Sequence, residues 1–344
     1  MTPDPRTSAA PTPPSPELIF NTLRGFQHTA ALKTAIALDL FTFVGEGLDT
    51  PAALAQRTQC AERGVRILCD SMAVLGMLAK FEGRYQLTPD SAAFLSRHSP
   101  AYLGSIAEFL TSPTQMEGFA RLTEAVRIGG TAAPEDPGLA HDSPHWVNFA
   151  RNMAPMMRFP AQALAELLLP KVTQPCKVLD IAAGHGLFGI AMAQRNPHAQ
   201  IYALDWPSVL EVAQQNAIAA GVADRWHALP GNAFETDLGS DYDWVLLPNF
   251  LHHFDPATCE SLLRRVHASL APEGEVAAPE FVVDDDRLTP PTSALFALIM
   301  LANTPHGDAY SFADLDQMFR NAGFSDTELH PLPPTMQRVV IATP

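Results

Sequence analysis

Cysteine is scarce in this chain, with four residues among 344, and no two of them stand in a CxxC pair. Structural zinc sites need paired Cys or His ligands at short spacings, and disulfide-stabilised domains need many patterned cysteines. We therefore expect reduced thiols at Cys60, Cys69, Cys176 and Cys259, with no disulfide and no bound metal.

Positive charge is also scarce, because 22 Lys and Arg face 37 Asp and Glu, giving a formal net charge of −15. Such a surface repels nucleic acid and anionic membranes, and the basic residues form no cluster. No stretch reaches the roughly 20 apolar residues of a membrane-spanning helix. Residues 1–17 carry six prolines and no hydrophobic run of a secretory signal. We expect a disordered arm there, a cytoplasmic protein, and no nucleic-acid or membrane partner.

The first 140 residues have a helical pattern. Serine or threonine before proline favours a helix start, because the hydroxyl caps free amides and proline loses no hydrogen bond at the first position. Four such pairs predict helix starts: Ser15-Pro16, Thr50-Pro51, Thr88-Pro89 and Ser99-Pro100. Between two of them the chain predicts a helix, a second helix from about Glu62 to Leu78, and a hairpin through Glu82 to Arg84. This is a winged-helix outline.

Helix-turn-helix proteins read DNA through the second helix. Here that helix has only Arg63 and Arg66 near its start and is apolar over most of its length. The pattern favours packing over groove reading, so residues 18–110 are predicted to form a dimerisation domain. A ligand-sensing regulator that touches DNA is the alternative left open.

From about residue 170, short apolar runs alternate with amphipathic helices. Predicted strands are 177–181, 200–204, 227–229, 244–247 and 275–283, with helices at 187–195, 208–220 and 256–270 between them. A helix capped by Ser311 ends at Gly323, and strands near Thr327 and over 338–342 close the edge. This alternation predicts a parallel doubly wound sheet over residues 171–344, after a helical linker and pocket segment over 111–170.

The most informative stretch is KVLDIAAGHG, from Lys177 to Gly186, which is a strand entering a glycine turn. About 20 residues later the strand IYALD ends at Asp205, the separation expected of a carboxylate that binds a ribose. Asp180 precedes Gly184 by four residues and is placed to accept from an ammonium group, which S-adenosylmethionine has and NAD lacks. Gly189 completes a GxGxxG spacing that is a weak signal alone. The alternative for Asp205 is a strand-end or helix-cap acid.

Further motifs follow in order: LDWP (204–207), GNAFE (231–235), FLHHFD (250–255), LAPEGEV (270–276) and GDAYSFADLDQMFRNAGF (307–324). With DIAAGHG they resemble the class I S-adenosylmethionine-dependent small-molecule O-methyltransferases of the caffeate/acetylserotonin type, over residues 17–343. The resemblance implies an α/β fold, with a Rossmann-like doubly wound methyltransferase sheet and an N-terminal all-helical winged-helix-like dimerisation domain whose wing is the short hairpin. It also implies a homodimer.

The implied cofactor is S-adenosyl-L-methionine, with S-adenosyl-L-homocysteine as product and no metal. The family pattern assigns Asp180, Gly184 and Gly186 to its methionine end and Asp205 to the ribose hydroxyls. The other expected contacts are Trp206, Asn232, Ala233, Phe234 and Asn249. Two positions depart from the family, since Ala182 replaces a glycine and Asn232 replaces the usual aspartate. An amide oxygen still accepts a hydrogen bond from an exocyclic amine.

In the resembling family the general base is the histidine of an L-H-x-[WF] motif, which corresponds to His252. Histidine suits this task because its pKa is near ~6.5. Glu280 matches the glutamate that orients the base, whereas the second family glutamate aligns with Ala309, with Asp308 adjacent. The alternatives are that His252 and His253 cap the next helix or fill a packed corner, and that Glu280 is a solvated strand-end acid.

The expected acceptor is a small aromatic molecule bound by apolar walls. Predicted contacts are Met153, Met157, Phe250, His253, Phe296, Met300 and Asn303, with Phe159 beside them. Methionines at helical spacing are also common in cores. The run Asp284 to Asp286 is read as a solvated loop rather than a magnesium site, because no matching Asp-Asn pair occurs upstream.

These features predict an enzyme that transfers a methyl group to a hydroxyl of a small aromatic or polyketide-like metabolite in secondary metabolism. Two alternatives keep the cofactor. One is C-methylation, and the other is a relative that uses the bound cofactor for decarboxylation, hydroxylation or a pericyclic step.

Overall fold

The computed structural model describes residues 14–133, 142–168 and 174–344. The chain divides into two compact units, the first ending at Ala107 and the second beginning at Glu108. The predicted arm, residues 1–17, lies mostly outside the described residues, and its last residue, Glu17, begins the first helix. Within the described ranges, no helix has the length and apolar character required to cross a membrane.

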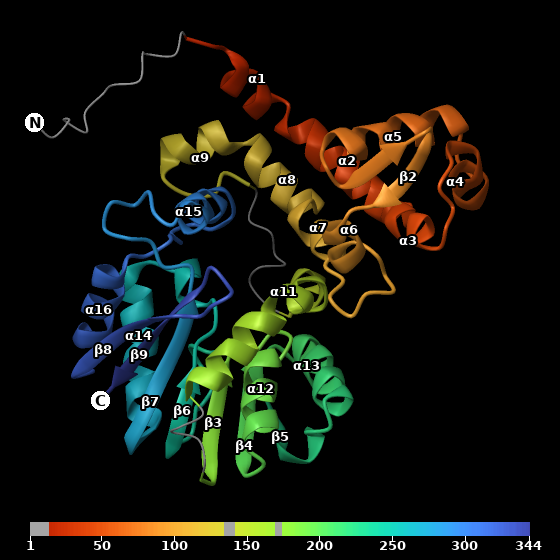
Figure 1. Cartoon of the computed structure of the whole chain (residues 1–344). Coiled ribbons are helices and arrows are strands. Elements are labelled where there is room, and N and C mark those ends of the chain that lie inside the picture. The colour runs from red at the N-terminus through yellow and green to blue at the C-terminus, as the bar shows by residue number, and fades with distance from the viewer. Residues whose placement is uncertain (1–13, 134–141, 169–173) are drawn as a thin grey trace, which may run out of the picture. The chain divides into compact units, whose positions relative to one another are not determined.

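The first unit consists of helices and one hairpin (Figure 1). Its elements are α1 (Glu17–Leu23), α2 (Gly25–Ala37), α3 (Leu40–Gly45), α4 (Pro51–Thr58), α5 (Glu62–Val74), β1 (Leu78–Phe81), β2 (Arg84–Leu87) and α6 (Pro89–Phe94). The second helix of the winged-helix outline, α5, buries Val65, Cys69 and Met72 in the core of this unit. Its apolar face is therefore used for packing.

Three of the four predicted helix starts are confirmed. Thr50 and Thr88 accept hydrogen bonds from the backbone amides three residues on, and α1 begins directly after Ser15-Pro16. The fourth prediction, at Ser99-Pro100, is wrong. The Ser99 hydroxyl accepts from the amide of Ala101, only two residues on, and the chain turns there without starting a helix. Such local bonds compete with helix capping.

The second unit holds a seven-stranded sheet with the order β5-β4-β3-β6-β7-β9-β8. Its strands are β3 (Cys176–Ile181), β4 (Ala199–Asp205), β5 (Trp226–Pro230), β6 (Tyr242–Leu246), β7 (Leu270–Glu280), β8 (Asp326–Pro331) and β9 (Arg338–Thr343). The first five are parallel, and β9 is antiparallel to both β7 and β8. The predicted fold class is confirmed.

Helices cover both faces of this sheet (Figure 1). The unit contains α7 (Ile106–Leu110), which crosses the boundary, α8 (Pro113–Ala120), α9 (Leu122–Ile128), α11 (Pro144–Leu168), α12 (Leu187–Arg195), α13 (Pro207–Ala219), η2 (Ala223–Arg225), η3 (Leu251–His253), α14 (Pro256–Ser269), α15 (Pro291–Asn303) and α16 (Phe312–Asn321). Residues of α11, α12 and α13 share one hydrophobic cluster with the sheet, and residues of α14 and α16 share another.

The chain order reverses between β3 and β6, which is where doubly wound sheets bind their ligands, beyond the carboxyl ends of the strands. We call this the ligand edge, formed by the ends of β3, β4, β6 and β7. The prediction that the strand beginning at 275 runs to Val283 is wrong, because β7 ends at Glu280. Glu280 is opposite Arg338, the first residue of β9, so the ladder between β7 and β9 ends there, and Val283 forms an isolated bridge to Ser311 instead.

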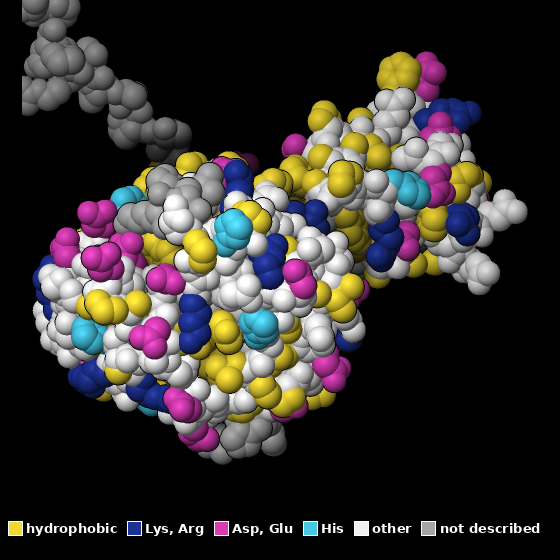
Figure 2. Space-filling view, turned by 90° about the horizontal axis from the view of Figure 1, so that it is seen from below, with side chains coloured by type: hydrophobic (Ala, Val, Ile, Leu, Met, Phe, Trp, Pro, Cys, Tyr) yellow, Lys and Arg dark blue, Asp and Glu magenta, His cyan; other side chains and the backbone are white. Residues whose placement is uncertain are grey.

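Charged side chains of both signs are interspersed over the face seen in Figure 2, among the residues that the structure describes. The exposed ion pairs of the described residues include Arg264 with Glu260 and Arg320 with Asp316. Exposed pairs of this kind contribute little to stability.

Candidate active site

The glycine turn after β3 depends on left-handed backbone conformations. Ala182, Gly184 and Gly186 have φ angles of 53°, 56° and 74°. A Cβ atom on Gly186 would lie 2.9 Å from the Cβ of Ala213 on α13, so a side chain there meets both strain and a clash. Ala182 adopts the conformation that favours glycine although it carries a methyl group, at a cost of roughly 1–2 kcal/mol.

Gly189 has a structural role that its weak motif did not indicate. Its amide donates to Oδ2 of Asp180 at 3.0 Å. A Cβ atom there would lie 2.6 Å from the side chain of Ile201 on β4. Gly189 therefore lets α12 approach the sheet closely.

Asp180 is fully buried at the end of β3. Only Oδ2 is paired, and Oδ1 has no hydrogen-bond partner among the described residues. Burial raises the pKa of this carboxyl to about 8, against the opposing effect of the Gly189 amide. An unpaired buried carboxylate is costly, so this oxygen is suited to a cationic or hydrogen-bonding ligand group.

Asp205, at the end of β4, links this strand to the glycine turn. Its Oδ2 accepts from the Gly184 amide at 2.8 Å, and its Oδ1 accepts from the Trp206 amide at 2.7 Å. Burial raises the pKa of Asp205 to about 6, and Asp142 adds to that rise. The carboxylate is therefore fixed beside the glycine turn, as a cofactor role requires, and the same bonds order the strand end.

The GNAFE segment follows β5 and begins a turn. Oδ1 of Asn232 accepts from the Phe234 amide at 3.0 Å, so the amide oxygen expected to face an adenine amine is already hydrogen bonded within its own turn. Ala233 is buried. The Phe234 ring lies edge-on to Phe254 at 4.9 Å and tilted to Phe250 at 6.2 Å.

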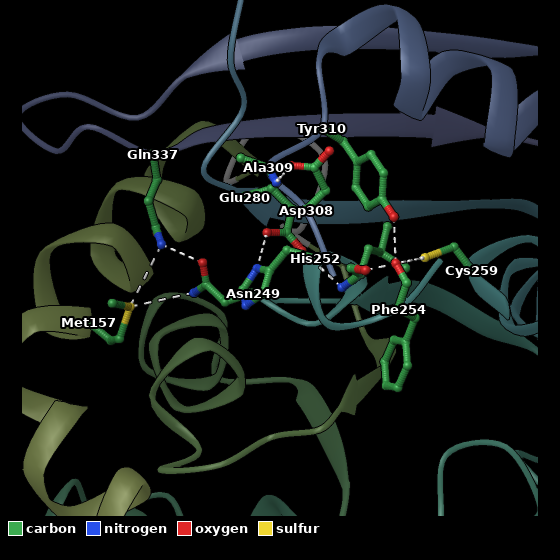
Figure 3. A network of polar contacts seen from close by, with 11 residues as sticks. Met157, Asn249, His252, Phe254, Cys259, Glu280, Asp308, Ala309, Tyr310 and Gln337 are labelled. Carbon is green, nitrogen blue, oxygen red and sulfur yellow. Dashed lines mark hydrogen bonds and ion pairs between the residues drawn. The ribbon is translucent and has the colours of Figure 1, made fainter. Parts of the chain in front are cut away.

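The structure brings His252 and Glu280 into direct contact (Figure 3). Nδ1 of His252 lies 2.6 Å from Oε2 of Glu280, and both residues are buried, with 5% and 3% of their surface exposed. Oε1 of Glu280 accepts from the Leu251 amide at 2.9 Å. The carboxylate thus fixes both the backbone and the ring of the η3 turn, and it leaves Nε2 of His252 available.

The segment before α16 supports the same turn from the other side. The Asp308 amide donates to the His252 carbonyl at 3.0 Å, and the Tyr310 hydroxyl donates to the Phe254 carbonyl at 2.5 Å. The Asp308 carboxylate accepts from the Ala309 amide and pairs with Arg287, so it takes no part in the His252–Glu280 pair. Sequence motifs gave no indication of the Tyr310 contact.

His253 lies against His252, with ring centroids 4.4 Å apart, and edge-on to Trp146 of α11 at 5.8 Å. Burial lowers the pKa of His253 well below its usual value, and His252 and His145 lower it further. This ring is therefore neutral at neutral pH. Trp146 was not predicted as a site residue; it also packs against Val209 and Val212 of α13.

The one aromatic ring of α15, Phe296, reaches the same place. Phe296 lies edge-on to the His252 ring at 4.8 Å and stacks on Phe281 at 4.3 Å. Met300 follows one turn later and is buried, whereas Nδ2 of Asn303 donates to the Ile299 carbonyl within the helix. Positions 296, 300 and 303 share one face of α15.

Two methionines predicted as substrate contacts lie buried on α11. Met153 is 5% exposed, and Met157, also 5% exposed, belongs to the core cluster on the α11 side of the sheet. Phe159 of the same helix is 45% exposed.

Two of the three acids after β7, Asp284 and Asp286, hold their loop by hydrogen bonds. Asp284 pairs with Arg338 at 2.6 Å and accepts from the Thr289 hydroxyl at 2.7 Å. Asp286 accepts from the amides of Leu288 and Thr289. Among the described residues, no group of three or more His, Cys, Asp or Glu is arranged to hold a metal ion.

A surface groove of about 710 Å³ runs beside α15, lined by Leu295, Leu298, Asp255 and Asp308 among others. A smaller groove of about 330 Å³ lies between the starts of α11 and α13. Neither groove is lined by His252 or Glu280.

Comparison with known proteins decides the family. Residues 140–325 match the O-methyltransferase domain, and residues 20–97 match the O-methyltransferase dimerisation domain. The chain belongs to the O-methyltransferase family. The predictions of this family and of an enzyme are confirmed.

Individual relatives agree with this assignment. A candidate O-methyltransferase of Nostoc punctiforme, with a solved structure, is 52% identical, covers 96% of this chain and 99% of its own, and has a TM-score of 0.91. The 3-hydroxy-5-methyl-1-naphthoate 3-O-methyltransferase of Streptomyces sahachiroi is 28% identical over 93% of both chains. Human N-acetylserotonin methyltransferase, solved with S-adenosylmethionine, shares the fold at 21% identity, covering 98% of this chain and 99% of its own, with a TM-score of 0.84.

Proposed function

We propose that this O-methyltransferase is a homodimer that uses S-adenosyl-L-methionine to methylate a hydroxyl group of a small aromatic or polyketide-like metabolite, with His252 as general base. The observation that carries the proposal is the buried His252–Glu280 pair at the ligand edge, 2.6 Å apart. A paired imidazole with one free nitrogen is what proton removal from a hydroxyl requires.

The residues of the glycine turn fit the proposed cofactor. Oδ1 of Asp180 is buried and lacks a partner among the described residues, so an ammonium group would satisfy it. Asp205 is held beside the turn, where its carboxylate is suited to a ribose diol, and Gly184 and Gly186 leave the backbone bare. When bound, S-adenosylmethionine supplies an electrophilic methyl group on sulfur.

The base works through its two ring nitrogens. Glu280 accepts from Nδ1–H of His252, which fixes the tautomer with a free Nε2. Nε2 takes the hydroxyl proton of the acceptor, and the carboxylate stabilises the imidazolium that results. Because Ala309 stands where relatives place a second glutamate, Glu280 is the one carboxylate proposed to act on this ring.

The acceptor class follows from the surroundings of His252. Phe296, Phe250 and neutral His253 present aromatic surfaces, which favour an acceptor with a planar aromatic ring. The relative from Streptomyces sahachiroi is named for a hydroxynaphthoate acceptor. A hydroxyl on a fused aromatic ring is therefore the first acceptor to test.

The homodimer is supported by the match of residues 20–97 to the dimerisation domain. Apolar side chains of α1 and α2 are exposed in the single chain, including Leu18 at 77% and Phe26 at 68%. Exposed apolar surface of this kind is typical of an interface.

The test is calorimetric titration with S-adenosylhomocysteine, followed by incubation with S-adenosylmethionine and a panel containing 2-naphthol, 3-hydroxy-2-naphthoate and simple phenols. We expect micromolar binding with one site per chain, and an O-methylated product identified by mass spectrometry and NMR. Folded protein that binds neither form of the cofactor contradicts the proposal. A product methylated on carbon contradicts the O-methyl assignment and retains the cofactor.

A further inference from the structure

Next to the His252–Glu280 pair lies a polar contact to which no sequence motif points. Gln337, just before β9, is 3% exposed, and its Nε2 donates to Oδ1 of Asn249 at 2.5 Å. Nδ2 of Asn249 lies 3.5 Å from the sulfur of Met157 on α11. Figure 3 shows the three side chains converging from separate parts of the chain. Both polar groups of the Asn249 amide are therefore held by its neighbours.

Asn249 is the residue at which the chain turns from β6 toward the base. Its φ angle is 55°, a left-handed conformation that costs free energy in any residue but glycine, although asparagine tolerates it better than most. Its amide donates to the Pro279 carbonyl at 2.8 Å. Two residues later, the Leu251 amide donates to Glu280, and His252 follows. A change in the backbone conformation of Asn249 would move the His252 imidazole relative to the Glu280 carboxylate.

Stability alone does not explain the polarity of Gln337. Its Oε1 is buried without a hydrogen-bond partner among the described residues. Exchanging oxygen and nitrogen in both amides would reverse donor and acceptor and would still leave one polar atom of Gln337 unpaired. A buried unpaired polar atom costs about 1–3 kcal/mol, which an apolar side chain of similar shape avoids.

We infer that Gln337 is a positioning residue, which holds Asn249 in its left-handed conformation and thereby sets the orientation of His252 toward Glu280. The inference rests on the proposed function, because it gives Gln337 a role in catalysis only if His252 is the base. Gln337 acts through Asn249 and is not assigned a contact with substrate.

The first test replaces the amide with an apolar side chain of similar length, Gln337→Met. The buried Nδ1–H of His252 should give a far-downfield proton NMR signal, which a His252→Gln variant identifies by lacking it. We expect Gln337→Met to shift or abolish this signal, and to slow methyl transfer to the fastest acceptor of the panel about 10- to 100-fold. We expect its Tm to stay equal or rise, and its affinity for S-adenosylhomocysteine to stay unchanged. The matched control is Gln317→Met, on the exposed face of α16, where the side-chain amide donates to Oδ1 of Asn321.

The second test asks whether Gln337 acts through Asn249, because glycine lacks the side-chain amide that Gln337 binds. Glycine adopts a positive φ without cost, so in an Asn249→Gly background the Gln337→Met change should have at least fivefold less effect on rate and signal. Equal effects in both backgrounds overturn the inference. So does an unchanged signal in Gln337→Met, a wild type without the signal, or a parallel loss of Tm, signal and cofactor affinity. Failure of the wild type to bind S-adenosylhomocysteine or to methylate contradicts the proposed function instead, while the NMR measurements still decide the positioning.

Discussion

At the ends of β3 and β4 the ligand edge is built mainly from backbone, whereas at the ends of β6 and β7 it is built from side chains. On the first side, residues with positive φ angles shape the glycine turn, and the carboxylate of Asp205 ties this turn to the neighbouring strand. On the second side, one histidine and one glutamate form a buried pair. A conformation can survive substitution at a cost in strain, as Ala182 shows, whereas a hydrogen-bonded pair of side chains is lost when either partner is replaced.

The two sides of the ligand edge each contain one departure from the family pattern, Ala182 and Ala309. Ala182 keeps the φ angle of 53° that the turn needs, so the replaced glycine changes energy more than shape. Ala309 brings no carboxylate, and the adjacent Asp308 is engaged with Arg287 and its own loop. The base side therefore depends on Glu280, and we expect it to be the more sensitive half.

The largest expected effect tests the base itself. His252→Ala should reduce the rate of methyl transfer by roughly 10²–10⁴-fold and leave the affinity for S-adenosylhomocysteine nearly unchanged, because the ring is proposed to act on the proton alone. Steady-state kinetics and calorimetry measure the two quantities. His267→Ala, at the last turn of α14, serves as the control. Wild-type activity in the His252 variant would remove the residue from the mechanism.

The second-largest expected effect tests Glu280, the hydrogen-bond partner of His252. Glu280→Gln keeps the shape of the side chain but removes the charge that stabilises the imidazolium, so we expect a loss of about 10²-fold in kcat. The pH–rate profile should also move, whereas Glu328→Gln on the exposed part of β8 should change neither. A variant with normal kcat and an unmoved profile would show that Glu280 serves the Leu251 amide only.

The cofactor side should respond to pH. The pKa of Asp180 is about 8 in the folded, ligand-free protein, so its carboxyl group is protonated at neutral pH. In the unfolded chain the same carboxyl group has already lost this proton. The resulting stability is complete below the unfolded pKa and is lost as pH rises through 8. Affinity for S-adenosylhomocysteine should change oppositely, rising up to tenfold per pH unit from pH 6 to 8, because the ammonium needs the ionised carboxylate. Calorimetry and Tm measurements over pH 6–9 test this, and Asp180→Asn should flatten both curves.

The shape of the turn is tested by a matched pair of glycines. Gly186→Ala combines a φ of 74° with a contact of 2.9 Å to Ala213. It should lower the affinity for S-adenosylhomocysteine about tenfold or more and destabilise the fold by about 2–3 kcal/mol. Gly221→Ala is the control, because Gly221 has a φ of 71° and an added Cβ atom would have no neighbour within 4 Å. It should cost only the backbone strain and leave the affinity unchanged. Equal affinities of the two variants would contradict a close approach at Gly186.

The smallest expected effect is a gain in stability. Ala182→Gly removes the left-handed strain and raises the free energy of unfolding by up to about 1 kcal/mol, after the added chain entropy of glycine is subtracted. The exposed Ala219→Gly in α13 should do the opposite, since glycine weakens a helix by roughly 1 kcal/mol. Denaturant titration compares them. Destabilisation by both would mean that the Ala182 methyl group has packing value.

Much of the fold could be predicted from the sequence because its signals are local. Alternating apolar runs indicated the strands, and Ser311 with Asp314 indicated the capped start of α16, where both side chains bond the backbone. The Ser99 start failed because its hydroxyl satisfied a nearer amide, and β7 ended early because β9 begins opposite Glu280. Both errors arise because hydrogen-bonding groups compete for partners, and a sequence pattern does not show which partner is bound.

The sequence by itself determined the glycine turn, the acid at the end of β4, the paired histidines and the family, since each is a short motif whose chemistry lies in the residues themselves. The roles of the site residues stay predictions, but their placement belongs to the tertiary structure. Only folding brings Glu280 within 2.6 Å of His252, buries an unpaired Asp180 oxygen, and joins Gln337 to Asn249 across 88 positions of sequence. Burial and contact between distant segments arise from packing, so no local pattern could encode them.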